Sequence, residues 1–134
     1  MTVPYEAIYP GPWKDSTTFS PAVRCGEWLL ISGMTAVDEN RNIVGVGDMA
    51  AQARYIYKKI GAVLAAAGAG FEHVVETVDY VVTLEGYDKT AEVRRELFKG
   101  PPYPAATGVV VAGLVRPQAL IEIKATARIP RPSL

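Results

Sequence analysis

Glu122 is the residue of this sequence best suited to transfer a proton, because of the pattern around it. Residues 121–129 alternate apolar and polar side chains, as in a strand with a different neighbour on each face. The polar face carries Glu122, Lys124, Thr126 and Arg128. Burial of a carboxyl group raises its pKa, which suits acid or base catalysis near neutral pH. The alternative is a solvated polar stripe. Lys124, roughly 7 Å along the strand, either forms a charge pair with Glu122 or holds a substrate carboxylate.

A second set of residues could wall a small binding pocket. Ser32 and Gly33 end an apolar strand, where a hydroxyl group and free backbone donors can face a ligand. Phe19 and Tyr103 are aromatic residues in loops beside the strands and could close the same pocket. Each pair also has a structural interpretation, a strand-to-turn transition for the first and ordinary packing for the second.

Composition excludes several classes of function. The 134 residues carry 14 basic and 14 acidic side chains with no basic block, so neither nucleic acid nor an anionic membrane is an expected partner. The single cysteine, Cys25, and the single histidine, His73, cannot build a disulfide or a cysteine or histidine metal site. The apolar runs are too short to cross a membrane, and residues 1–20 lack the apolar core of a signal peptide. The expected location is the cytoplasm.

Hydrophobic periodicity predicts the elements that position these residues. Apolar residues spaced by four and three from Met49 to Ala67 predict a helix, with Asp48 as its N-cap and Gly68 just past its end. The other expected elements are a hairpin at 23–32, a short strand at 43–44, a long strand at 73–83, a second helix from Asp88 to Gly100 and two final strands. The order ββ(β)αβαββ predicts one α+β domain over residues 1–134, with a mostly antiparallel sheet and an irregular arm at residues 1–16.

Two helices can cover only one face of such a sheet. The valines at positions 109–111 nevertheless predict a strand buried on both faces. We therefore expect a second copy of the chain to cover the free face, with Glu122 at or near the interface.

Five segments together resemble the RidA (YjgF/UK-type) family of reactive-intermediate deaminases. They begin at Phe19 (FSPAVR), Leu30 (LISG), Ala51 (AQAR), Tyr103 (YPAAT) and Ile121 (IEIKA). The resemblance spans about residues 19–129 and implies a chorismate-mutase-like fold, with both helices on one face of the sheet. It also implies a homotrimer whose sheets form a central barrel, with three sites in the clefts between subunits. The implied activity is the hydrolysis of enamines or imines, such as 2-aminoacrylate, to a 2-keto acid and ammonia without a metal or organic cofactor.

The resemblance also implies roles for individual residues. Glu122 matches the glutamate that is thought to orient the attacking water. Ser32 and Gly33 match the Ser-Gly pair that lines the cleft, and Phe19 stands where many members have a tyrosine. Thr107 matches a small polar residue of the substrate site.

One departure from the family pattern bears on the substrate. Deaminases of 2-imino acids carry Pro-Ala-Arg before the serine or threonine, and that arginine grips the substrate carboxylate; here the position is Ala106. Hydrogen bonds to charged groups contribute about 1.5–3 kcal/mol each, so the loss should weaken binding or rate for such substrates roughly ten- to a hundred-fold or more. Gly108 replaces a common cysteine and predicts a roomier site. We therefore expect a larger or less acidic substrate than 2-iminopropanoate, or one held by Lys124 or by an arginine of another subunit, with Arg24 and Arg116 as candidates.

The leading hypothesis is a divergent trimeric deaminase or hydrolase that acts on a small enamine, imine or related unsaturated nitrogen compound. One alternative is a tautomerase or hydrolase of a ring-cleavage product such as an aminomuconate. Another is a non-catalytic trimer that binds a small metabolite or a protein partner. The neutral, unpatterned composition gives no support to a ribonuclease.

Overall fold

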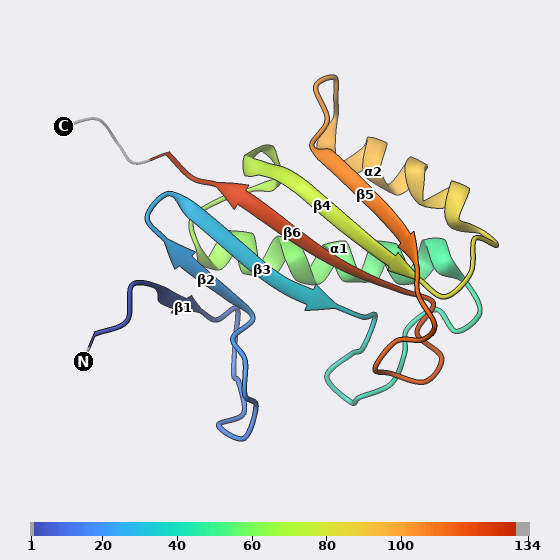
Figure 1. Ribbon diagram of the computed structural model, residues 1–134, viewed down its shortest axis with the longest axis horizontal. Helices are drawn as coiled ribbons and strands as arrows, with labels where there is room; N and C mark the ends of the chain where they lie inside the picture. Colours follow the sequence, from blue (N-terminus) through green and yellow to red (C-terminus); the bar gives the residue numbers. More distant parts are fainter. Residues whose placement is uncertain (1, 131–134) are drawn as a thin grey trace.

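The fold is a single twisted sheet with two helices against one face, in a computed structural model that describes residues 2–130 (Figure 1). Residue 1 and residues 131–134, the two ends of the expected domain range, lie outside the described residues. The strand order is β1-β2-β3-β6-β4-β5. The strands are β1 (Glu6–Ile8), β2 (Ala22–Cys25), β3 (Trp28–Met34), β4 (Val74–Val81), β5 (Ala105–Val110) and β6 (Ile121–Arg128). Neighbouring strands are antiparallel except β4 and β5, which are parallel.

The helices begin and end close to where the sequence predicts. Helix α1 (Met49–Ala66) starts after Asp48, whose side chain accepts a hydrogen bond of 3.0 Å from the Ala51 N–H, and Gly68 follows it with φ 75°. Helix α2 (Thr90–Phe98) follows the short 3₁₀ helix η2 (Tyr87–Lys89), and a second 3₁₀ helix, η1 (Phe71–His73), precedes β4. No helix within residues 2–130 is long and apolar enough to cross a membrane.

The predicted element order is confirmed, with one strand in a different place. The third strand of the N-terminal half is β1, which lies inside the arm expected to be irregular. Residues 43–44 form no strand, because Ile43 makes only an isolated bridge to Val37. A three-residue strand in a segment rich in Pro and Gly gives too weak a period-2 signal to be recognised in the sequence.

Strand β6 has the two faces that its sequence predicts. The side chains of Ile121, Ile123, Ala125 and Ala127 are buried toward the helices, whereas Glu122, Lys124, Thr126 and Arg128 are half-buried or exposed. Burial of one such isoleucine contributes about 1.5–3 kcal/mol, so this face is firmly fixed toward α1. Because side chains alternate along a strand, Glu122 is held on the open face of the sheet.

The expectation that residues 109–111 are buried on both faces is wrong for the single chain. Val109 is 40% and Val110 55% exposed, and every residue of β5 is exposed. The reason is topological: β5 is an edge strand that pairs only with β4. Its apolar surface is therefore free to meet another molecule.

Candidate active site

A β-bulge interrupts the pairing of β3 and β6 where the sequence predicts the Ser-Gly pair of the site. Ile31 pairs with Ala125 and Met34 with Ile123, so Ser32 and Gly33 together face the single residue Lys124. A bulge leaves one residue outside the regular ladder and bends its strand. The backbone of β3 therefore turns beside the polar face of β6.

The carboxylate of Glu122 lies directly over Gly33. A Cβ atom at this glycine would overlap Glu122 Oε2 and lie 3.2 Å from its Cδ. A larger residue at this position would therefore displace the end of the Glu122 side chain. Within residues 2–130, no group forms a hydrogen bond or ion pair with the half-buried carboxylate of Glu122.

This carboxylate faces a cavity of about 550 Å³, called here the bulge pocket. One wall is the N-terminal arm and another is the bulge with the loop that follows it. The pocket then passes the end of β3 and reaches Lys59, Ala62 and Val63 of α1. It brings together four of the predicted site residues: Phe19, Ser32, Gly33 and Glu122.

Lys124 lies in an adjoining hollow of about 320 Å³ on the open sheet face. Gly33, Val115 and Glu122 line both hollows, and Tyr80 lines this second one. Tyr80 pairs with Glu122 across β4 and β6. Glu122 therefore stands at the junction of the two cavities.

Ser32 holds in place the segment that joins the N-terminal arm to β2. Its hydroxyl group donates a hydrogen bond of 2.7 Å to the Ser20 carbonyl, and its backbone N–H donates one of 2.9 Å to the Pro21 carbonyl. Because the hydroxyl proton is used in this bond, the Ser32 oxygen can only accept a hydrogen bond from a ligand.

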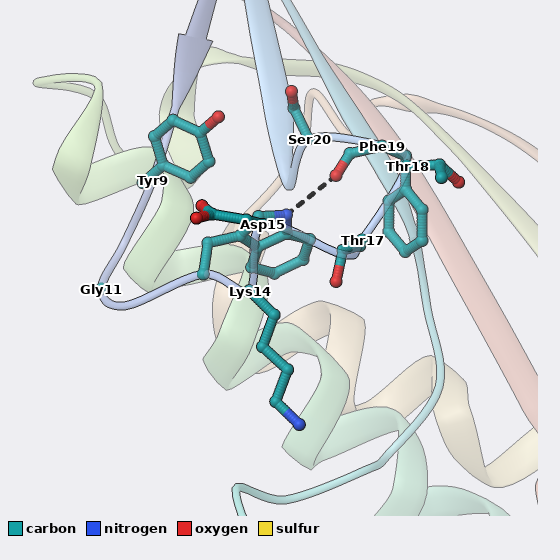
Figure 2. Close-up of a pocket in the computed structure, with 9 residues that line it drawn as sticks. Tyr9, Gly11, Lys14, Asp15, Thr17, Thr18, Phe19 and Ser20 are labelled. Carbon is teal, nitrogen blue, oxygen red and sulfur yellow. Dashed lines mark hydrogen bonds between the residues drawn. The ribbon is translucent and has the colours of Figure 1, made fainter.

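The arm itself is organised around Trp13. Its indole N–H donates a hydrogen bond of 2.9 Å to the Phe19 carbonyl, drawn as the dashed line in Figure 2, and the two rings meet edge to face with centroids 5.7 Å apart. Trp13 and Phe19 line both the bulge pocket and a second hollow of about 750 Å³ within the arm. Phe19 is 58% exposed, so its ring is available to a ligand or to another subunit.

Besides Lys124, which lines only the adjoining hollow, three predicted site residues lie in neither of these two cavities within one chain. Tyr103 lines a different hollow, with Phe71 and Phe98. On β5, Thr107 pairs with Val78 on the open face, and Ala106 pairs with Thr77 on the helix side. Glu122 and the position of the missing arginine thus lie on opposite faces of the same sheet.

The expectation of a roomier site at Gly108 is wrong. A Cβ atom at this position would overlap the hydroxyl group of Tyr87 and lie 3.1 Å from its Cζ. The side chain of Tyr87 has filled the space that a larger residue would take.

The bulge pocket contains charged residues that sequence reasoning missed. Lys59 donates hydrogen bonds of 2.9 Å to the carbonyls of both Thr35 and Val37. Burial lowers the pKa of Lys59, the nearby Arg116 lowers it further, and Asp38 opposes both. Lys59 is three residues after the buried Ile56 and four before the buried Val63. This spacing puts Lys59 at the edge of the apolar stripe of the helix, and it is the feature of the sequence from which its place beside the pocket could have been predicted.

The two arginines considered as replacements for the missing one lie in different places. Arg116 lines the bulge pocket, whereas Arg24 lines a hollow with residues 3–6 and donates through Nε to the Gly26 carbonyl. The loop that carries Arg116 is held by Gln52, which is fully buried. Its amide group donates to the Gln118 and Gly45 carbonyls and accepts from the Leu120 N–H, and so joins the two loops beside the pocket.

The fold and the bulge define a class of α+β protein with a carboxylate site on the open face of its sheet. The model of the Endoribonuclease L-PSP family matches residues 13–129. The chain is 33% identical to the 3-aminoacrylate deaminase RutC of Acinetobacter baylyi over 128 residues, which cover 95% of this chain and 100% of that protein.

Solved structures agree with this class. PA3499 from Pseudomonas aeruginosa, of unknown function, superposes with a TM-score of 0.82 at 34% identity, covering 93% of this chain and 92% of that one. Rv2704 from Mycobacterium tuberculosis, a member of the YjgF/YER057c/UK114 family, superposes with a TM-score of 0.77 at 28% identity, covering 93% and 99%. The chain belongs to the Endoribonuclease L-PSP family, which is the RidA (YjgF) family that its sequence motifs indicate.

Proposed function

We propose that the protein is a hydrolase that releases ammonia from a small enamine or imine, with Glu122 as the group that transfers protons. The observation that carries this proposal is the unpaired carboxylate of Glu122, which lies over Gly33 at the junction of two cavities. The deaminase activity of the 33% identical RutC supports the same class of reaction.

Glu122 can perform each proton transfer of such a hydrolysis. An enamine first becomes the imine: protonated Glu122 donates a proton to the carbon, and the resulting carboxylate takes one from the nitrogen. A water molecule then adds its oxygen to the carbon of the C=N bond, and its proton passes to the carboxylate of Glu122 and on to the nitrogen. In the second step the carboxylate takes the hydroxyl proton and returns it to the nitrogen, the C–N bond breaks, and a carbonyl compound and ammonia are left. General acid–base catalysis of this kind contributes about a hundred- to ten-thousand-fold.

The protein further acts as a homotrimer in this proposal, with the site completed between subunits. The support is the exposed edge strand β5, which carries Val109 and Val110, and the free sheet face with Leu30 at 48% exposure. Paired or covered edges are the usual state of such a strand. Light scattering after gel filtration tests this part, because a monomer would contradict it.

The test of the activity is ammonia release from freshly generated imines and enamines of increasing size, including 2-iminopropanoate and 3-aminoacrylate. Wild type should act on at least one of them, and Glu122→Gln should lose the activity while it retains the wild-type melting temperature. Activity that survives in Glu122→Gln would remove Glu122 from the mechanism. A wild type that acts on none of the compounds would favour a binding protein over an enzyme.

A further inference from the structure

We propose that the bulge pocket binds an anionic group of the substrate at the end that reaches α1, between Lys59 and Arg116, while the reacting carbon lies beside Glu122. The statement that a reacting carbon lies beside Glu122 rests on the proposed function. The substrate is then an unsaturated nitrogen compound whose carboxylate, or other anion, is separated by several bonds from the carbon that loses ammonia.

Positive charge is concentrated in this pocket. Four cationic side chains line it, against the two carboxylates of Asp38 and Glu122. The cationic residues are Lys14, Arg41, Lys59 and Arg116. The whole chain has a net charge of zero, so the excess is local to the pocket. A cavity lined by an excess of one charge attracts ligands of the opposite charge.

Lys59 is placed to contact such a ligand. Two of its three ammonium protons are directed to the carbonyls of Thr35 and Val37, and Nζ also lies 6.0 Å from the centre of the Tyr55 ring. One N–H is left that can donate to a ligand. Lys59 is half-buried and close enough to Arg116 for the two cations to disfavour each other. An anion between them would relieve both the desolvation of Lys59 and this repulsion.

Asp38, the other acidic residue of this region, is engaged elsewhere. Its Oδ1 accepts hydrogen bonds of 2.8 Å and 3.0 Å from the backbone N–H groups of Asn40 and Asn42. In the part of the chain that the structure describes, neither Arg41 nor Arg116 forms a side-chain hydrogen bond or ion pair. Both guanidinium groups therefore remain available to a ligand.

The two ends of the pocket lie on opposite sides of the sheet. Glu122 is on the open face, whereas Lys59 belongs to α1, which covers the other face (Figure 1). The pocket connects them past the end of β3, and its volume of about 550 Å³ is within the range of about 300–1,000 Å³ of small-molecule sites. A 2-imino acid carries its carboxylate on the atom next to the reacting carbon, so this carboxylate would stay near Glu122. A longer substrate can reach the cationic end of the pocket, and it has no use for an arginine at position 106.

The separation between Glu122 and the cationic end of the pocket can be tested by binding alone, with a series of ω-amino acids from 3-aminopropanoate to 6-aminohexanoate. The ammonium group of each probe can meet Glu122, and its carboxylate can reach the cationic end only when the chain is long enough. Alkylamines of equal length, which lack the carboxylate, are the control ligands. Dissociation constants are measured by calorimetry at constant ionic strength for wild type, Arg116→Gln, Lys59→Met and the control Arg24→Gln.

For wild type we expect the longer amino acids to bind about ten-fold or more tightly than the matching amines, and 3-aminopropanoate to show no such advantage. Arg116→Gln and Lys59→Met should each remove most of the advantage, and Arg24→Gln should keep it. Because Lys59 also holds two carbonyl groups, Arg116→Gln is the decisive variant. Equal binding of amino acids and amines to wild type would overturn the proposal, and so would an advantage that persists in Arg116→Gln.

The same measurements separate this proposal from the proposed function. Turnover of an imine that depends on Glu122, without any carboxylate advantage, would leave the hydrolase standing and reject the anion subsite. A carboxylate advantage without turnover of any imine would keep the subsite and reject the hydrolase.

Discussion

Asp79 and Glu122 lie on the neighbouring strands β4 and β6, but their side chains point to opposite faces of the sheet. Asp79 faces the helices, is 4% exposed, and accepts a hydrogen bond of 2.7 Å from Tyr87 at Oδ2; its Oδ1 is buried with no partner among the described residues. The carboxylate of Glu122 also has no partner among them, yet it opens onto two cavities. The lack of a hydrogen-bond partner therefore does not by itself identify a reactive carboxylate, because of these two only Glu122 can be reached by a substrate.

The largest expected effect is the loss of activity when the Glu122 carboxylate is replaced, with the same replacement at Asp79 as its control. Glu122→Gln should lower ammonia release from the best imine substrate about a hundred- to ten-thousand-fold, and Asp79→Asn should leave it within about two-fold of wild type. Steady-state rates and the melting temperatures of both variants provide the measurement. A comparable loss of activity in folded Asp79→Asn would show that the helix-side carboxylate also serves the reaction.

The same two faces of the sheet can be compared by adding a methyl group at Gly33, beside Glu122, or at Gly108, beside Tyr87. A Cβ atom would overlap Glu122 Oε2 at Gly33 and the Tyr87 hydroxyl group at Gly108. Gly33→Ala should displace the catalytic carboxylate and lower activity by up to about a hundred-fold with little change in stability. Gly108→Ala should instead destabilise the fold by about 1–3 kcal/mol through overpacking and retain activity. Urea unfolding and rate measurements on both variants test this, and the reverse assignment of the two effects would contradict it.

The sequence predicts the parts of the molecule that depend on local pattern. The helix after Asp48, the hairpin of β2 and β3 and the alternating faces of β6 each follow from residue spacing, and the structure confirms them. The motif resemblance is also confirmed as family membership. These features are encoded in neighbouring residues, so they are visible without a structure.

Features that depend on contacts between distant residues were missed. The bulge at Ser32 and Gly33 depends on pairing with β6, and Lys59 enters the pocket only because the loop after β3 folds back on α1. Gln52 joins the loops of Gly45 and Gln118, the latter 66 residues away in the chain. The exposure of Val110 depends on strand order, which the hydrophobicity of one strand does not reveal.

A third prediction concerns the stability of the helix-side face. Arg94 donates hydrogen bonds of 3.0 Å to the Tyr57 hydroxyl group and 2.7 Å to Thr77 Oγ1, and burial raises the pKa of Tyr57 to about 12. Arg94→Met would leave these buried groups without their charged donor and should cost about 1.5–3 kcal/mol of unfolding free energy. Arg95→Met, at the next and exposed position of α2, is the matched control and should change stability by less than about 0.5 kcal/mol. Equal effects of the two variants in urea unfolding would show that the Arg94 hydrogen bonds contribute nothing specific.

The smallest effect is the pH dependence that Asp79 adds to stability. Burial raises the pKa of Asp79 above its ordinary value of 3.8, and the hydrogen bond from Tyr87 and the charge of Arg94 only partly oppose this. The folded state therefore holds the proton more tightly than the unfolded state. The contribution of Asp79 to stability is complete below pH 3.8 and is lost as the pH rises through the raised pKa. Asp79→Asn removes this loss, so the unfolding free energy of the variant minus that of wild type should increase with pH above 3.8 and then become constant. Urea unfolding of both proteins over a range of pH measures the difference. A flat difference would mean that Tyr87 and Arg94 balance the effect of burial on the pKa of Asp79, and a difference that falls with pH would mean that they outweigh it.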